Sequence, residues 1–281
     1  MSKQAIKELL GKFQLKEDPE RKYFVIFDID GTLRPDEVEA FDHRHPKIPP
    51  ETAKQLKELN VHKNIEIVIL TARSYIDMFK SNFPKDIIKY CGCGKQILDN
   101  EILMYPREEF QKSYDETVIL IEILKDIMGK EAVSKIDFLV APGDFALYFS
   151  ETDYTETKKY VVEKIDLVLG NSARWRISNN GREIIFVDHK YHYDKGDAAK
   201  DIMDTLDLTV PTQVFMFGDS HTDARAMEGL RDYQKDHPDK RLKVCNISIG
   251  ETLRENEMID YNFESHEDTI EFINHLYKLI F

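Results

Sequence analysis

Two aspartates, Asp28 and Asp30, follow an apolar run in the segment VIFDIDGTLRP, residues 25–35. Residues i and i+2 of an extended chain share a face, so both carboxylates can face one ligand. Gly31 comes next and allows the backbone to turn sharply, which presents N–H groups that can bind an anion. This segment therefore predicts an anion-binding site that also carries two acids.

Further polar side chains stand beside other apolar runs or before a predicted helix. They are Thr71 and Arg73 after residues 65–70, Lys195 before a helix predicted from residue 197, and Asp219 and Asp223 after residues 213–217. Ligands of open α/β sheets bind outside the carboxyl ends of the strands. We therefore expect these side chains to meet at one edge of a sheet.

The acids in this set predict a metal site. Asp28, Asp30, Asp219 and Asp223 would bring up to four carboxylates together. Unit charges about 4 Å apart repel by roughly 4 kcal/mol at an effective dielectric constant near 20, so such a site needs a cation. Oxygen ligands that also contact a phosphate are typical of Mg²⁺. Lys195 could supply one more positive charge.

The residue types indicate phosphoryl transfer. We predict that Asp28, held by the metal and Lys195, stays ionised and attacks phosphorus. Asp30, on the turn, would protonate the leaving oxygen and later deprotonate the attacking water. The phosphoryl oxygens would be bound by the turn and by the segment after the second strand, at Gly31, Thr32, Thr71, Ala72 and Arg73.

Strands alternate with helices in two parts of the chain. Four apolar runs predict buried parallel strands, at residues 23–27, 65–70, 213–217 and 243–249. Helical patterns lie between or after them, so residues 1–80 and 190–281 are expected to form a doubly wound α/β core. Residues 81–189 show hairpins and helices instead, among them a hairpin around Asp99 and Asn100, a helix near residues 155–169 and a turn at residues 90–94 that would face the core site. This pattern predicts an inserted α+β module.

The bulk composition excludes several classes of partner. A formal net charge of −13 argues against nucleic acid, whose phosphates most of the surface would repel. No uncharged apolar stretch approaches the roughly 20 residues of a membrane helix, and the first residues do not resemble a signal peptide. Three cysteines without a disulfide pattern favour a reducing compartment. We therefore expect a cytoplasmic protein with a small phosphorylated substrate.

At these residues the sequence resembles the haloacid dehalogenase-like phosphohydrolase superfamily. DIDGT at 28–32 matches its first motif, Thr71 its second, Lys195 its third, and GDSHTD at 218–223 its fourth. The resemblance implies a Rossmann-like core, a Mg²⁺ ion and an aspartyl-phosphate intermediate on Asp28. It also implies metal ligation by the Asp28 carboxylate, the Asp30 backbone carbonyl and Asp219, with Asp223 close by or acting through water.

Asp30 and the long insertion indicate which branch of the superfamily the sequence resembles most. An acid at position 30 is found in the phosphatases and phosphomutases of the superfamily, and the size of the insertion is typical of an α+β cap that selects the substrate. The cap order is most similar to trehalose-6-phosphate phosphatase and its relatives, which include sucrose-phosphatase. Ser220 and Ala224 stand where those phosphatases usually carry acids.

The resemblance predicts a hydrolase of phosphoric monoesters, acting on a small phosphorylated sugar. One predicted cap hairpin carries hydrogen-bonding side chains suited to sugar hydroxyls, at Arg176, Asn180, Arg182 and Glu183. Three alternatives stay open at this point. They are a sugar phosphomutase, a phosphatase of another small ester such as a polyol phosphate or nucleotide, and a non-catalytic ligand-binding protein on the same fold.

Overall fold

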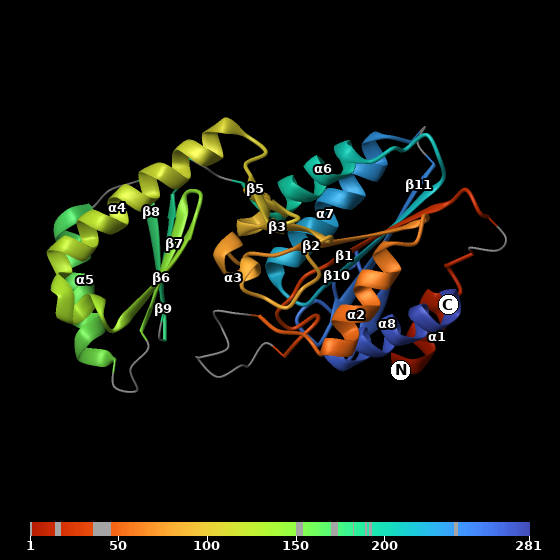
Figure 1. The fold of residues 1–281 in the computed structure, drawn as a ribbon, viewed down its shortest axis with the longest axis horizontal. Coiled ribbons are helices and arrows are strands. Elements are labelled where there is room, and N and C mark those ends of the chain that lie inside the picture. Colours follow the sequence, from red (N-terminus) through yellow and green to blue (C-terminus); the bar gives the residue numbers. More distant parts are fainter. Residues whose placement is uncertain are drawn as a thin grey trace. The chain divides into compact units, whose positions relative to one another are not determined.

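The computed structural model describes residues 2–14, 18–35, 46–149, 154–169, 174–181, 183–188, 190, 193–238 and 241–281. The chain divides into two compact units. We call Met1–Met104 with Tyr193–Phe281 the core unit, and Tyr105–His192 the inserted unit. The α/β architecture agrees with the predicted fold class (Figure 1).

The core unit combines one sheet with helices on both faces. In chain order its elements are α1 (Ser2–Leu10), β1 (Lys22–Phe27), α2 (Pro50–Asn60), β2 (Ile65–Leu70), α3 (Tyr75–Phe79), β3 (Ile88–Cys91), the short turn η1 (Gly92–Gly94), β4 (Gln96–Asp99), β5 (Ile102–Met104), α6 (Lys195–Thr205), β10 (Thr212–Gly218), α7 (His221–Asp236), β11 (Leu242–Ile249), β12 (Tyr261–Phe263) and α8 (His266–Ile280). Among the described residues the strand order is β12-β11-β10-β1-β2-β3-β4-β5.

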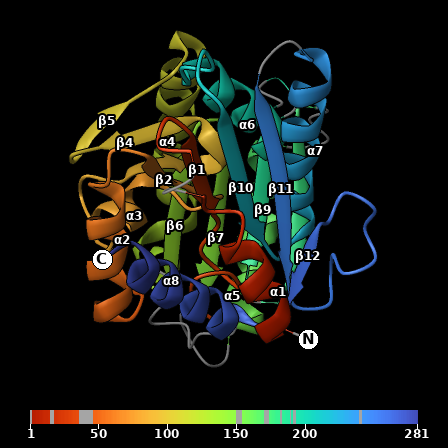
Figure 2. The same ribbon diagram turned by 90° about the vertical axis from the view of Figure 1, so that its right-hand side faces the viewer.

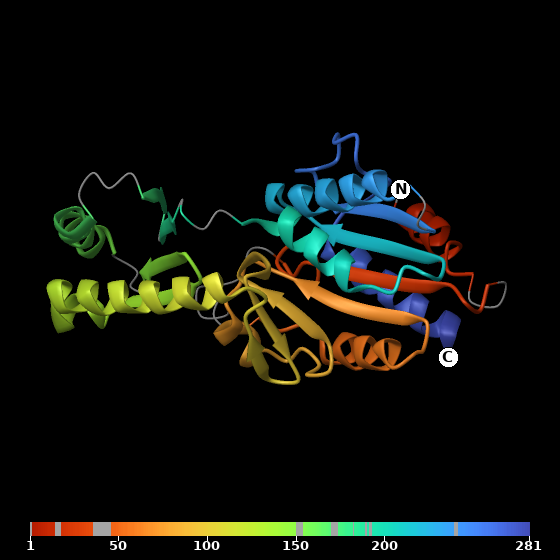
Figure 3. The same cartoon turned by 90° about the horizontal axis from the view of Figure 1, so that it is seen from above.

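The central strands are parallel and buried on both faces. β1, β10 and β11 run beside one another (Figure 2), and their nearly continuous apolar sequences suit a sheet that helices cover on each side. Residues of α1, α2 and α8 pack on one face, where Phe13 stacks on Tyr23 and Phe215 with ring centroids 4.8 and 4.7 Å apart. Helices α6 and α7 pack against each other, and α7 contacts β10 and β11 (Figure 3).

The inserted unit is an α+β module with its own core. Its elements are α4 (Glu108–Val133), β6 (Ile136–Ala141), β7 (Asp144–Phe149), α5 (Thr155–Leu169), β8 (Trp175–Asn180) and β9 (Glu183–Asp188). The strands form an antiparallel sheet in the order β6-β7-β9-β8, and its buried side chains pack with those of α4 and α5. Trp175 packs edge-on against Phe145 at 5.5 Å, so its ring belongs to this core.

The boundary between the units differs from the one expected near residue 81. Strand β3 pairs in parallel with β2, and β4 and β5 then extend the same sheet as antiparallel strands. Residues up to Met104 therefore belong to the core unit, and the expected start of the insertion is corrected from 81 to 105. The hairpin predicted around Asp99 and Asn100 is present, but it completes the core sheet. That the inserted unit acts as a substrate-selecting cap stays a prediction.

A membrane-spanning role finds no support in the helices: within the described ranges none is both long enough and apolar enough to cross a bilayer.

A buried lysine lies on an inner strand of the core sheet. Lys89 on β3 is 3% exposed, and its Nζ donates hydrogen bonds to the carbonyl oxygens of Pro84 and Ile87, both at 2.7 Å. Burial lowers the pKa of Lys89 from 10.5 to about 8, although nearby acids oppose the change. The neutral amine is therefore favoured in the folded protein at moderately alkaline pH.

This burial predicts a pH dependence of stability. Between pH 8 and 10.5 the unfolded chain binds the Lys89 proton more strongly than the folded chain, so the free energy of unfolding should rise with pH. The contribution of Lys89 to that rise is at most about 3 kcal/mol. Urea unfolding at several pH values would show a flatter rise for Lys89→Met than for the wild type. Parallel curves for the two proteins would contradict this account of Lys89.

Candidate active site

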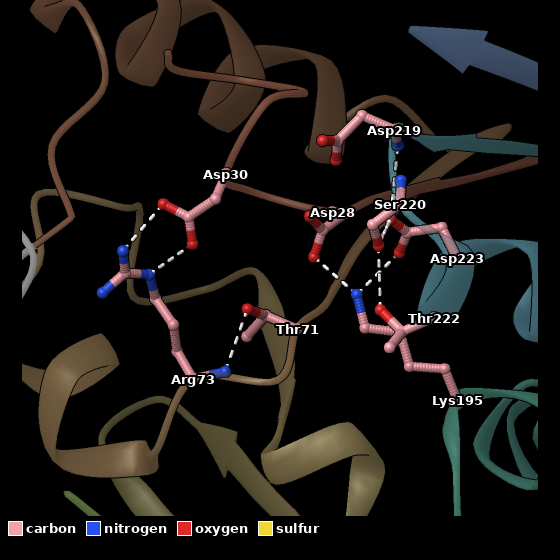
Figure 4. A network of polar contacts seen from close by, with 9 residues as sticks. All are labelled: Asp28, Asp30, Thr71, Arg73, Lys195, Asp219, Ser220, Thr222 and Asp223. Carbon is pink, nitrogen blue, oxygen red and sulfur yellow. Dashed lines mark hydrogen bonds and ion pairs between the residues drawn. The ribbon is translucent and has the colours of Figure 1, made fainter. Parts of the chain in front are cut away.

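The parallel register brings the ends of three neighbouring strands to one edge of the core sheet. Phe27, the last residue of β1, pairs with Phe217 of β10 and Ile69 of β2. The residue after β1 is Asp28, and its backbone N–H donates to the Phe217 carbonyl oxygen at 3.0 Å. Asp219 follows β10 directly. The sequence motifs at these strand ends are therefore neighbours in space (Figure 4).

Lys195 joins the first and last of these motifs. Its Nζ lies 2.7 Å from Asp28 Oδ1 and 2.6 Å from Asp223 Oδ1, and its side chain is 2% exposed. Burial alone would lower the pKa of Lys195, but the Asp223 and Asp28 carboxylates outweigh it and raise this pKa. The ammonium group is consequently held charged between two carboxylates.

Asp223 also orders the loop that carries Asp219. Its Oδ1 accepts from Lys195, while its Oδ2 accepts from the N–H of Asp219 at 3.2 Å, from the N–H of Ser220 at 3.0 Å and from the Ser220 hydroxyl at 2.6 Å. Ser220 and Asp223 form a capping box at the start of α7. The Asp223 carboxylate thus stabilises both the first turn of the helix and the loop before it. Ser220, an apparent departure from the trehalose-phosphatase pattern, thus has a structural role.

Three of the predicted acids meet as a group that could hold a metal ion. Asp28, Asp219 and Asp223 each offer an oxygen within 4.8 Å of the others. Burial raises the pKa of Asp28 well above its usual range, and the Asp223 carboxylate adds to the rise, while Lys195 opposes it. A hard divalent cation such as Mg²⁺ fits this all-oxygen set and would offset the repulsion between the acids.

Gly31 makes room for the Asp219 carboxylate. Its φ is +73°, and a β-carbon built there would lie 2.2 Å from Asp219 Oδ2 and 2.4 Å from its Cγ. Such approaches are shorter than any real contact, so a side chain at position 31 would displace Asp219. The glycine after the two aspartates therefore lets the Asp219 carboxylate approach closely, and it also suits the left-handed turn.

Gly31→Ala is expected to weaken Mg²⁺ binding at least about tenfold, because one carboxylate ligand is pushed out of place. Gly250→Ala is a matched control, since Gly250 has the same φ of +73° and nothing within 4 Å of its built β-carbon. Both variants bear the cost of alanine in a left-handed conformation, about 1 kcal/mol. Calorimetric titration with Mg²⁺ would measure the difference, and equal affinities in the two variants would contradict the role assigned to Asp219.

The Asp30 carboxylate does not join the acidic group. Arg73 holds it through two hydrogen bonds, from Nε to Oδ2 at 2.6 Å and from Nη2 to Oδ1 at 2.7 Å. Arg34, which the sequence reasoning missed, lies 3.5 Å from Asp30 Oδ1 with a side chain only 4% exposed. Its one sequence signal is its place four residues after Asp30. Metal ligation through the Asp30 backbone carbonyl stays a prediction.

The remaining predicted phosphate ligands lie around the same edge. Thr71 is buried, and its Oγ1 accepts the Arg73 N–H at 3.2 Å. The Thr32 hydroxyl is buried and has no hydrogen-bond partner among the described residues, so it can donate to an incoming oxygen. Ala72 is exposed beside them. The positions suit anion binding, and the assignment of these residues stays a prediction.

A turn with left-handed backbone angles contacts the backbone of Thr71 and Arg73 at this edge of the sheet. Gly92, Cys93 and Gly94 have φ values of 55°, 58° and 91°. The Gly92 N–H donates to the Arg73 carbonyl at 2.7 Å, and the Cys93 N–H donates to the Thr71 carbonyl at 2.9 Å. The cysteines of this stretch are free, and Cys91 is buried. The sequence indicated a turn facing the site, but not that it fixes the backbone of the second motif.

The four predicted sugar-binding residues lie in the inserted unit. Arg176 is an exposed residue of β8 that pairs with Val187. Asn180 pairs with Glu183 at the β8–β9 end, and Arg182 lies outside the described residues. Their role stays a prediction.

No protein-family model and no curated protein matches the chain, but solved structures do. The C-terminal domain of C. albicans trehalose-6-phosphate phosphatase matches with a TM-score of 0.67 at 16% identity, over 98% of this chain and 97% of the other. Aspergillus fumigatus trehalose-6-phosphate phosphatase matches at 0.58 and 14% identity, over 98% and 97%. The chain has a haloacid dehalogenase-like fold.

The same haloacid dehalogenase-like fold also occurs in a protein described by another role. The C-terminal domain of the Candida albicans trehalose synthase regulatory protein matches with a TM-score of 0.53 at 11% identity, over 90% of this chain and 93% of the other. Fold similarity at such identities leaves the choice between roles to the site residues.

Proposed function

We propose that this protein is a Mg²⁺-dependent phosphatase that hydrolyses a small phosphorylated sugar through an aspartyl-phosphate intermediate. The observation that carries the proposal is the buried group at the strand ends, where Lys195 bridges Asp28 and Asp223 and Asp219 lies close by. Phosphoryl transfer depends mainly on the positioning of the reacting groups and on the stabilisation of charge. This group of residues offers a carboxylate as nucleophile, a fixed cation beside it, and two further acids that could hold a metal ion.

In the first proposed step an oxygen of Asp28 attacks phosphorus, and the bond between phosphorus and the ester oxygen breaks. Asp30 gives a proton to that oxygen, which leaves as the sugar hydroxyl. In the second step Asp30 takes a proton from water as the water oxygen attacks phosphorus. The bond between phosphorus and Asp28 breaks, and inorganic phosphate leaves.

Other residues would bind and stabilise the transferring group. The hydroxyls of Thr32 and Thr71 and the backbone N–H of Gly31 would donate hydrogen bonds to phosphoryl oxygens. The next three backbone N–H groups, at residues 32–34, already donate to the Ile29 carbonyl oxygen. Lys195 would keep Asp28 oriented, and its charge opposes the rise in the pKa of Asp28 that burial and Asp223 cause. When bound, Mg²⁺ would neutralise the carboxylates of Asp28 and its neighbours and offset negative charge on the phosphoryl oxygens.

A sugar as the leaving group is supported by the fold and by the inserted unit. Two of the similar structures are trehalose-6-phosphate phosphatases. In the inserted sheet Arg176 is adjacent in sequence to the core residue Trp175, so by strand alternation the two side chains point to opposite faces. We propose that Arg176, Asn180, Arg182 and Glu183 contact sugar hydroxyls.

The experiment that tests the proposal is a phosphate-release screen over sugar phosphates, polyol phosphates and nucleotides, with and without Mg²⁺. We expect Mg²⁺-dependent release with a preference for a sugar phosphate. Turnover that requires a phosphorylated activator and returns the phosphoryl group to a sugar would indicate a phosphomutase. Tight binding of a sugar phosphate without any release would favour the non-catalytic alternative, which the similarity to a regulatory domain supports.

A further inference from the structure

The resting position of Asp30 does not suit the proton transfer assigned to it. Both of its carboxylate oxygens accept hydrogen bonds from the Arg73 guanidinium, at 2.6 and 2.7 Å. Figure 4 shows the carboxylate turned toward Arg73 and away from Asp28. An oxygen that accepts from a guanidinium is not placed to exchange a proton with a leaving group beside Asp28.

The two arginines near Asp30 differ in how they are placed. Arg34 is 4% exposed and approaches one oxygen at 3.5 Å, whereas Arg73 is 13% exposed and engages both oxygens. The Arg73 backbone is fixed, because its N–H donates to Thr71 Oγ1 and its carbonyl accepts from Gly92. Its guanidinium stands at the end of a flexible side chain and can move without the backbone.

A phosphoryl group offers Arg73 a stronger partner than Asp30. Guanidinium binds phosphate and carboxylate with the same two-pronged geometry, but a phosphate monoester carries up to two negative charges where a carboxylate carries one. The anchored backbone of Arg73 follows Thr71, the residue expected to bind phosphoryl oxygens. Arrival of substrate therefore places a competing anion next to the Arg73–Asp30 pair.

We propose, on the basis of the function proposed above, that Arg73 is a positioning residue that keeps the Asp30 carboxylate turned away from the leaving group until a phosphoryl group binds. The guanidinium then exchanges the carboxylate for phosphoryl oxygens, and the released Asp30 turns toward the ester oxygen. Through the Arg73 side chain, binding of the phosphoryl group thus determines when Asp30 can donate its proton.

The direct test follows Arg73 itself. The ¹⁵N signal of its Nε–H group, assigned by its loss in Arg73→Lys, is recorded while the wild type is titrated with inorganic phosphate in the presence of Mg²⁺. The signal is expected to shift along with the Thr71 amide, and to do so in Arg34→Lys as well. An Arg73 signal that stays fixed while the Thr71 amide responds would overturn the exchange alone. Absence of any phosphate response would overturn the exchange and the proposed function together.

A second test compares substrates with different leaving groups. Aryl phosphates need little protonation of the leaving oxygen and alkyl phosphates need much, so Asp30→Asn should lower turnover of alkyl phosphates far more. Arg73→Gln should instead raise KM for both kinds by at least about tenfold and leave the ratio of their kcat values within about twofold of the wild type. A selective loss of alkyl turnover in Arg73→Gln would show that Arg73 stays on Asp30 during the reaction. If Arg73→Gln does not fold, the NMR titration decides.

Discussion

Replacement of Asp28 by asparagine is expected to lower phosphate release at least about 10²-fold, because the amide cannot form the covalent intermediate. The shape of the side chain is kept, and Lys195 retains Asp223 as a partner at 2.6 Å. The variant should therefore fold, and the loss should appear in kcat. Initial rates of phosphate release with saturating Mg²⁺ measure it.

The control for this variant is Asp207→Asn, the same chemical change at an exposed loop residue whose local partner is Thr209. It should leave the rate unchanged. Retention of more than about a tenth of wild-type activity by Asp28→Asn would show that Asp28 is not the nucleophile.

Replacement of Lys195 by methionine is expected to cost about 3–5 kcal/mol of unfolding free energy, because it leaves two buried carboxylates without their cation. Asp28 and Asp223 are 6% and 0% exposed, so water cannot take over the role of the ammonium group. Urea unfolding at neutral pH, without divalent ions that could supply the missing charge, measures the loss. Activity should also fall, since Asp28 loses the contact that orients it.

Lys200→Met is the matched control, because Lys200 lies on the same helix, is 45% exposed and approaches Asp232 only at 3.7 Å. An exposed pair of this kind contributes at most about 1 kcal/mol. Equal stabilities of the two variants would contradict the account of Lys195 as the charge that the buried acids require.

Elements with strong local signals were predictable from the sequence. The apolar run at 65–70 coincides with β2, and the helical pattern at 155–169 coincides with α5. The end of each core strand could be read as well, because an apolar run stops at a polar motif. This is why Asp28 and Asp219 could be assigned to one edge before their distances were known. Lys195 was assigned there from its place at the start of a predicted helix, and it is the first residue of α6.

Elements fixed by distant partners could not be predicted in the same way. The β4–β5 hairpin was recognised, but its place in the core sheet depends on β3 pairing with β2, from Val68↔Ile88 onward. No local pattern states which sheet a hairpin extends. The expected domain boundary was therefore placed too early, at 81 instead of 105.

The direction of a side chain on a turn was equally out of reach. Alternation along a strand suggested that Asp30 would share a ligand with Asp28, yet Arg73, 43 residues away, turns its carboxylate aside. The contact depends on where the β2–α3 loop passes, which the turn at Gly92–Gly94 helps to fix. Arg34 was missed because a charged residue after a turn gives no sign of burial.

The central claim is that Asp28 takes up the phosphoryl group, and chemical trapping tests it most directly. Enzyme turning over a substrate found in the screen is quenched with borohydride, which reduces an aspartyl phosphate to homoserine, and the peptide that contains residue 28 is analysed by mass spectrometry. We predict homoserine at position 28 only when substrate and Mg²⁺ are both present. Steady release of phosphate with residue 28 recovered solely as aspartate, or with homoserine at another position, would contradict the account.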